Sequence, residues 1–92
     1  MADIVLTTLN ARYFHASLGL RYLLANMGEL ETRTHLIEYT LDARPADIVE
    51  SLLQEAPRIV GFGVYIWNVE QTTQTVALLK QVRPDIVEVL GG

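Results

Sequence analysis

The residues best suited to bind a ligand lie in one stretch, residues 58–68, which reads Arg-Ile-Val-Gly-Phe-Gly-Val-Tyr-Ile-Trp-Asn. Its first half is a short continuous apolar run, typical of a strand covered on both faces in a parallel sheet. Gly61 and Gly63 have no side chain, so they leave room either for a closely packed helix or for a ligand. The second half lies where a strand passes into a helix, and there parallel sheets bind ligands. The stretch therefore predicts a buried strand followed by a ligand-binding loop with an apolar wall at 65–67.

A second group of polar and aromatic residues lies at 10–17 (Asn-Ala-Arg-Tyr-Phe-His-Ala-Ser), directly after the first predicted strand. In a parallel sheet this loop meets the loop at 65–68 at the same edge. Amide and hydroxyl side chains there can hydrogen-bond a polar ligand, and His15 carries an imidazole, a common metal ligand. Other interpretations stay open: Arg12 and Tyr13 can be ordinary surface residues, and Trp67 can pack in the core or an interface. The glycine pair Gly91-Gly92 can be only a turn.

The composition limits the classes of function. The 92 residues carry a net charge of −4 and are 50% hydrophobic, which indicates one small globular domain and disfavours nucleic acid as a partner. There is no cysteine, so the segment itself can form no disulfide, thiolate metal site or cysteine-held iron–sulfur cluster. The sequence shows no signal-like apolar core and no apolar run as long as a membrane span. We therefore expect a cytoplasmic domain without a membrane partner.

Strand and helix patterns alternate along the chain. Apolar runs predict strands at 3–9, at 32–39, from residue 58, and at 86–90. Apolar stripes at helical spacing predict three helices between them, formed by Leu20, Leu23, Leu24 and Met27; by Ile48, Val49, Leu52, Leu53 and Ala56; and by Val76 and Leu79, flanked by Leu78 and Val82.

Gly28 suits the end of the first helix. Pro45 suits the first turn of the second, which Pro57 stops. Asn68 and Gln71 form a variant of the capping box at the start of the third.

This alternation predicts an α/β domain spanning residues 1–92, with a parallel sheet and right-handed crossovers. We expect the flavodoxin-like (Rossmann-like) strand order 2-1-3-4, with the strand at 32–39 at one edge. A doubly wound domain normally continues after its fourth strand, whereas this chain stops at Gly91 and Gly92. We therefore expect an amino-terminal part of a longer multidomain protein. One face and the outer edge of the fourth strand should be poorly covered, and that edge could form a dimer.

Signatures of common nucleotide sites are absent from the sequence. There is no Gly-x-x-x-x-Gly-Lys run, and the loop after the first strand has only Gly19 in place of the three glycines of a dinucleotide site. The acidic residues of a phosphoacceptor receiver domain are also missing, since their places hold Asn10 and the region of Tyr65.

Three motifs together resemble a known family. They are Ser-Leu-Gly-Leu-Arg-Tyr-Leu-Leu-Ala at 17–25, the glycine-containing strand and loop at 57–68, and Pro-Asp-Ile-Val-Glu-Val-Leu-Gly-Gly at 84–92. At these spacings the chain, over essentially its whole length, resembles the N-terminal cobalamin-binding domain of radical S-adenosylmethionine enzymes. In that family the chain continues after the glycine pair and enters a barrel domain with a cysteine triad.

The resemblance implies a corrinoid, cobalamin, lying across the carboxyl ends of the strands. Its corrin ring would rest on the loops after the first and third strands, and its nucleotide tail would run beside the fourth. The segment alone would not be catalytic. It would present the cofactor to a barrel that holds an iron–sulfur cluster and S-adenosylmethionine, for methyl transfer or another radical reaction. The residues expected to contact the cofactor are Asn10, Arg12, Tyr13, Ser17, Gly63, Tyr65, Ile66, Trp67, Asn68, Gly91 and Gly92.

One departure concerns cobalt. Cobalamin mutases carry Asp-x-His-x-x-Gly after the first strand, and its histidine ligates cobalt, but here Asn10 and Arg12 occupy the first and third positions. Many radical enzymes of the family leave the lower cobalt position without a protein histidine, so we expect no metal ligand from this chain. His15 lies in the same loop at a different spacing, and the alternative for it is a bond to the backbone. We expect His35 to face solvent or to be paired.

Two classes of function therefore compete. The first is a corrinoid-binding module of a radical enzyme. The second is a flavodoxin-like regulatory or protein-interaction domain without cobalamin. The sequence that follows Gly92 in the gene separates them, because a Cys-x-x-x-Cys-x-x-Cys run there would indicate the first.

Overall fold

The computed structural model describes residues 3–10, 26, 28–64 and 68–91, and its elements alternate as predicted. The four strands are β1 (Ile4–Asn10), β2 (Thr34–Thr40), β3 (Ile59–Gly63) and β4 (Val87–Gly91). The helices within the described residues are the 3-10 helix η1 (Gly28–Arg33), α2 (Pro45–Gln54) and α3 (Val69–Val82). None of these helices has the length and apolar character needed to cross a membrane. The helix predicted from the stripe at 20–27 lies outside the described residues.

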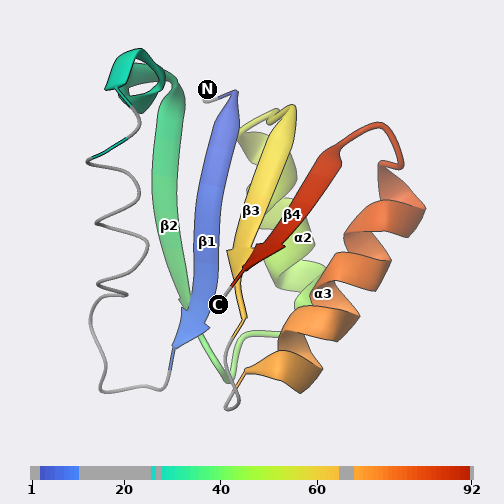
Figure 1. Ribbon diagram of the computed structural model, residues 1–92. Helices are drawn as coiled ribbons and strands as arrows, with labels where there is room; N and C mark the ends of the chain where they lie inside the picture. The colour runs from blue at the N-terminus through green and yellow to red at the C-terminus, as the bar shows by residue number, and fades with distance from the viewer. Residues whose placement is uncertain (1–2, 11–25, 27, 65–67, 92) are drawn as a thin grey trace.

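The strands form one parallel sheet in the order β2-β1-β3-β4 (Figure 1). β1 pairs with β2 on one side and with β3 on the other, and β3 also pairs with β4. This order confirms the flavodoxin-like topology and the edge position of β2. Because the chain turns from β1 towards β2 on one side and from β3 towards β4 on the other, the switch point lies between β1 and β3.

One face of the sheet packs against α2 and α3, which both lie on it (Figure 1). Successive strand residues point to opposite faces, so alternate residues of β1 and β3 meet the apolar stripes of the helices. We call this the packed face. Its buried cluster consists of Val5, Leu9, Ile48, Val49, Leu52, Val60, Phe62, Leu79 and Ile86. Each such side chain contributes about 1.5–3 kcal/mol when fully buried, so this cluster is a main source of stability.

Prolines mark both ends of α2, as predicted. Pro45 occupies the first turn, where its missing N–H leaves no helical bond unmade. The helix ends at Gln54, two residues before the position that Pro57 restricts. The prediction that Ala56 belongs to the apolar stripe is wrong. Ala56 lies beyond the helix with a left-handed φ of 50°, its side chain is exposed, and its N–H donates to the Leu53 carbonyl at 3.0 Å.

β2 begins two residues later than predicted, because η1 precedes it. Gly28 takes the left-handed conformation predicted for it, with a φ of 60°. Thr34 Oγ1 donates to the Leu30 carbonyl at 2.7 Å, and Arg33 forms an ion pair with Asp3. These contacts join η1 to the beginnings of β1 and β2.

The opposite face of β3 and β4 is covered by none of the described helices (Figure 1). Ile59, Val87 and Val89 lie on this face and are 36%, 55% and 53% exposed. The prediction that the third strand is covered on both faces is therefore wrong at Ile59, whereas the poor cover predicted for the fourth strand is confirmed. We call this surface the open half-face; its residues are Ile59, Gly61, Val87, Val89 and Gly91.

Candidate functional site

The carboxyl ends of β1, β3 and β4 meet at one edge of the sheet, which we call the carboxyl edge. In register, Thr8 of β1 lies beside Gly63 of β3, and Gly63 lies beside Gly91 of β4. Asn68, the last residue before α3, reaches the same edge with its side chain. This edge contains the switch point between β1 and β3, which is the ligand site of doubly wound sheets.

Asn68 is fully buried and joins β1 to β3 through its side-chain amide. Its Nδ2 donates to the Leu9 carbonyl at 2.9 Å, and to Thr8 Oγ1 and the Gly63 carbonyl at 3.2 Å each. Thr8 Oγ1 in turn donates to the same Gly63 carbonyl at 2.8 Å. The two N–H bonds of one amide thus serve three acceptors. We call the side chains of Asn68 and Thr8, with the Leu9 and Gly63 carbonyls, the Asn68 clamp.

The Asn68 clamp replaces the capping box predicted for α3. Within the described residues the side chain of Asn68 makes no capping hydrogen bond, so the reciprocal arrangement with Gln71 is not formed. The prediction of Asn68 as the residue that precedes the helix is correct, and its backbone carbonyl accepts from the Thr72 N–H at 2.9 Å. The amide turns to the sheet because buried carbonyl oxygens there require donors.

Space remains around Gly91 where β4 reaches the carboxyl edge. The Val64 N–H donates to the Gly91 carbonyl at 2.7 Å, so pairing of the two strands continues past the end of β3. Among the described residues, a Cβ placed on Gly91 would meet no atom within 4 Å beyond its chain neighbours. The nearby Val89 and Leu90 are exposed and apolar. A methyl-sized group therefore fits at Gly91 without moving any described side chain.

Gly61 lies in a more closely packed place than Gly91. Leu6 lies beside it in register on β1, and a Cβ placed on Gly61 would stand 3.0 Å from Leu6 Cδ2. That separation is shorter than an ordinary van der Waals contact between carbons. Of the two roles that the sequence left open for Gly61, the structure supports packing, with the neighbour being a strand side chain rather than a helix.

The structure brings four of the predicted contact residues to the carboxyl edge. Gly63 and Gly91 contribute backbone, Asn68 contributes its buried amide, and Asn10 is the last residue of β1. The remaining predicted contact residues lie outside the described residues, so their contacts with a cofactor stay predictions: Arg12, Tyr13, Ser17, Tyr65, Ile66, Trp67 and Gly92. His15 lies outside them as well.

Thr8 is the residue of this site that the sequence analysis missed. It is fully buried near the carboxyl end of β1 and both accepts and donates within the Asn68 clamp. Its residue type could have indicated it, because the hydroxyl of a threonine inside a strand buried on both faces needs a hydrogen-bond partner. Nothing in the spacing of residues 8 and 68 indicates that the partner is an asparagine sixty positions away.

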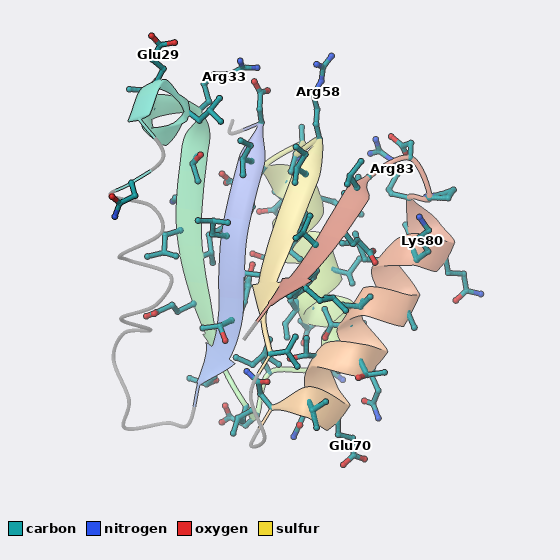
Figure 2. The ribbon with its side chains drawn as sticks, in the orientation of Figure 1. Glu29, Arg33, Arg58, Glu70, Lys80 and Arg83 are labelled. Atoms are coloured by element: carbon teal, nitrogen blue, oxygen red, sulfur yellow. The ribbon has the colours of Figure 1, made fainter. Side chains whose placement is uncertain are left out.

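The Asn68 clamp consists of neutral groups. Groups with a shifted pKa take no part in it: burial raises the pKa of the Tyr39 hydroxyl and of the Glu88 carboxyl, and hydrogen bonds from Arg83 lower that of Asp85. Arg33, Arg58 and Arg83 lie at the amino ends of the strands, opposite the carboxyl edge (Figure 2). In the described part of the chain no three acidic or histidine side chains are grouped to hold a metal ion. The described site thus suits a ligand held by shape and neutral hydrogen bonds.

Comparison with known families shows the family to which the chain belongs. The B12 binding domain family matches residues 4–92. The chain belongs to the B12-binding domain family. The class of regulatory domain without cobalamin is not favoured.

Among solved structures, this B12-binding domain is similar to a novel cobalamin-binding protein from Desulfitobacterium hafniense DCB-2, solved by crystallography at 1.5 Å. The two share 26% sequence identity with a TM-score of 0.66. The similarity covers 99% of this chain and 44% of that chain, so the B12-binding domain spans less than half the length of that protein. No curated protein matches the chain.

Proposed function

We propose that this B12-binding domain binds cobalamin across its carboxyl edge, with the nucleotide tail running along the open half-face beside β4. The observation that carries the proposal is the open position of Gly91, where an added Cβ would meet no described atom within 4 Å beyond the chain neighbours. A large and mostly apolar cofactor needs apolar surface together with a few fixed polar groups. The exposed Val87 and Val89 offer the apolar surface, and the neutral carboxyl edge around Gly63 offers the fixed polar groups.

The corrin ring would rest on the loops that follow β1 and β3. Residues 65–67 would form its apolar wall, Asn10 and Ser17 would meet its amides, and Arg12 would meet the phosphate of the tail or the neighbouring catalytic domain. Cobalamin supplies methyl-transfer or radical chemistry at its cobalt, which amino-acid side chains cannot supply. The role left to this chain is to bind the cofactor, orient it and exclude water from it.

Titration of the chain with hydroxocobalamin, followed by ultraviolet–visible absorbance, tests the proposal. We expect saturable binding and a base-off spectrum, because the tail would lie along β4 instead of ligating cobalt. A chain that unfolds cooperatively and yet leaves the spectrum unchanged at all concentrations would contradict cobalamin binding. That result would favour the alternative function, a regulatory or protein-interaction domain without cobalamin.

The place of the nucleotide tail is tested with Gly91→Val. The Cβ of the added side chain meets no described atom within 4 Å beyond its chain neighbours, so the fold should persist, but the side chain would occupy the proposed path of the tail. Cobinamide, a corrinoid without the nucleotide tail, is the matched ligand. We expect affinity for cobalamin to fall about tenfold or more, which corresponds to about 1.4 kcal/mol or more, while affinity for cobinamide is unchanged. An equal loss for both ligands would place the tail elsewhere.

We further propose that the domain presents cobalamin to the catalytic barrel of a radical S-adenosylmethionine enzyme, where an iron–sulfur cluster and S-adenosylmethionine reside. The three sequence motifs support this proposal. The absence of cysteine from the chain agrees with it, because the cluster would then belong to the barrel. The test is to read the gene beyond the codon for Gly92. We expect a Cys-x-x-x-Cys-x-x-Cys run in the same gene; another catalytic domain, or none, would contradict the radical reaction while leaving cobalamin binding intact.

A further inference from the structure

We infer that Asn68 is a positioning residue for the corrinoid site. Its buried amide ties the ends of β1 and β3 together and joins Gly63 to the start of α3, so that the carboxyl edge is held in its binding geometry before the cofactor arrives. The inference rests on the proposed cobalamin binding and deepens it. It assigns Asn68 a role inside the protein, in place of the direct contact with the cofactor that the sequence predicts.

The connectivity of the Asn68 clamp supports this role. The hydrogen bond from Asn68 Nδ2 to the Gly63 carbonyl joins the residue that ends β3 to the residue that precedes α3. Only residues 64–67 lie between them, so this bond fixes both ends of the segment with the predicted wall. The bonds to Leu9 and Thr8 fix the same point to β1, about sixty residues away in sequence.

Burial strengthens the hydrogen bonds of the Asn68 clamp. Asn68 and Thr8 are both 0% exposed, so water does not compete for the amide or the hydroxyl. Hydrogen bonds in such an environment are stronger than in water, and a lost partner leaves a buried carbonyl unsatisfied. A site held in its binding geometry loses less conformational entropy on binding, and this raises affinity. Loosening the clamp should therefore weaken corrinoid binding even where the chain stays folded.

The clamp requires an asparagine because it requires donors. Its side chain faces the Leu9 carbonyl, the Gly63 carbonyl and a hydroxyl that already donates elsewhere. Aspartate has nearly the same shape, but its carboxylate donates nothing and would face carbonyl oxygens. A carboxyl in such a place favours its protonated form, which regains one donor. Asn68→Asp therefore removes the donors without removing the volume, and the loss should depend on pH.

The experiment titrates wild type and Asn68→Asp with hydroxocobalamin and with cobinamide. We expect the variant to lose about tenfold or more in affinity for both ligands, by the same factor, because the carboxyl edge would support the ring that both contain. Gly91→Val, in contrast, should weaken only cobalamin. As the pH is lowered, the affinity of Asn68→Asp should recover relative to wild type measured in parallel. The folded fraction of Asn68→Asp is followed at each pH by circular dichroism, because recovered affinity at a constant folded fraction separates positioning from lost stability.

Leu52→Val on the packed face is the matched control for lost stability. Leu52 is fully buried on α2 and takes no part in the carboxyl edge, so this variant should unfold more easily and bind both corrinoids normally. Wild-type affinity in folded Asn68→Asp, or an equal loss in Leu52→Val, would overturn the inference. If the wild-type chain binds neither corrinoid, the proposed function itself fails, and the inference fails with it.

A milder pair of variants covers the case in which Asn68→Asp does not fold. Thr8→Val keeps the shape but removes the hydroxyl that accepts from Asn68 and donates to Gly63. We expect a several-fold loss of affinity for both corrinoids. Thr8→Ser retains the hydroxyl and should restore most of the affinity. Wild-type affinity in Thr8→Val would overturn the inference.

Discussion

The two faces of the β3–β4 half of the sheet are built from the same strands and differ in almost every other respect. Towards α2 and α3, β3 presents Val60 and Phe62, both buried in one apolar cluster. Away from those helices it presents Ile59, which is one-third exposed, and Gly61. On β4 the open half-face adds two exposed valines and a glycine with free space around it. The packed face is filled, and the open half-face combines apolar surface with room.

Because of this difference, we expect the packed face to determine the stability of the domain and the open half-face to determine its affinity for a ligand. A filled core loses free energy when a side chain is removed, because a cavity remains. A surface with free space loses little when a side chain is added, but it can no longer accept a ligand in that place. Substitutions on the packed face should therefore change unfolding, and those at the end of the open half-face should change affinity.

The largest effect is expected from Leu52→Ala. Leu52 is 0% exposed at the centre of the packed face. The substitution should lower the free energy of unfolding by about 2–5 kcal/mol, the range measured for buried leucines that leave a cavity. Urea denaturation followed by circular dichroism measures it. A loss below about 1 kcal/mol would mean that the packed face carries less of the stability than its burial indicates.

Gly61→Val and Gly91→Val compare a closely packed position with an open position on the same face of the sheet. A Cβ at position 61 would stand 3.0 Å from Leu6 Cδ2, which would have to move, whereas a Cβ at position 91 meets no described atom within 4 Å beyond its chain neighbours. We expect Gly61→Val to lower the free energy of unfolding by about 1–3 kcal/mol, and Gly91→Val to change it by less than about 0.5 kcal/mol. Thermal unfolding of the two variants side by side tests this. Equal losses would show that Gly91 is as constrained as Gly61.

The fold was predictable because its signals are local and repeated. Alternating strand and helix patterns, with prolines at the ends of α2, give the parallel topology and its switch point without any knowledge of side-chain contacts. Errors occur where a local bond overrides the pattern. The hydrogen bond of Thr34 to η1 delays β2, and the left-handed Ala56 ends the stripe of α2.

The candidate site was only partly predictable, because its central contacts are non-local. Gly63, Asn68 and Gly91 follow from the rule that ligands bind where parallel strands end. Asn68 also fits a helix cap, and only the three-dimensional position of Thr8 and Leu9 shows that its amide turns to the sheet instead. Likewise, the different surroundings of Gly61 and Gly91 depend on which side chain lies beside each in register.

A smaller effect is expected on the packed face near β2, from Tyr39→Phe. The Tyr39 hydroxyl donates to Ser51 Oγ at 2.8 Å, and its loss should lower the free energy of unfolding by about 0.5–1.5 kcal/mol. Burial raises the pKa of Tyr39 in the folded state, so its contribution is complete below the unfolded value of about 10 and decreases above it. Denaturation at pH 7 and above pH 10 measures both effects. Ser51→Ala should cost a similar amount, and adding it to Tyr39→Phe should cost little more.

The smallest effect concerns Glu88, a carboxylate on the packed side of the edge strand β4. Glu88 lies beside Val60 in register, and within the described residues its Oε1 is buried without a hydrogen-bond partner. Burial raises its pKa, against the attraction of Lys80. The folded state therefore favours the protonated carboxyl, and ionisation destabilises the fold as the pH rises above the unfolded value of about 4.3.

Glu88→Gln should accordingly raise the free energy of unfolding at pH 7, by less than about 1 kcal/mol because the side chain is partly exposed to solvent. The gain should vanish below about pH 4, where wild type is protonated in both states. Lys80→Gln should enlarge the difference, because it removes the opposing attraction. Urea denaturation of the variants at pH 7 and pH 4 measures these differences. A gain that persists unchanged at pH 4 would mean that the shape of the side chain, and not its charge, is poorly suited to the packed face.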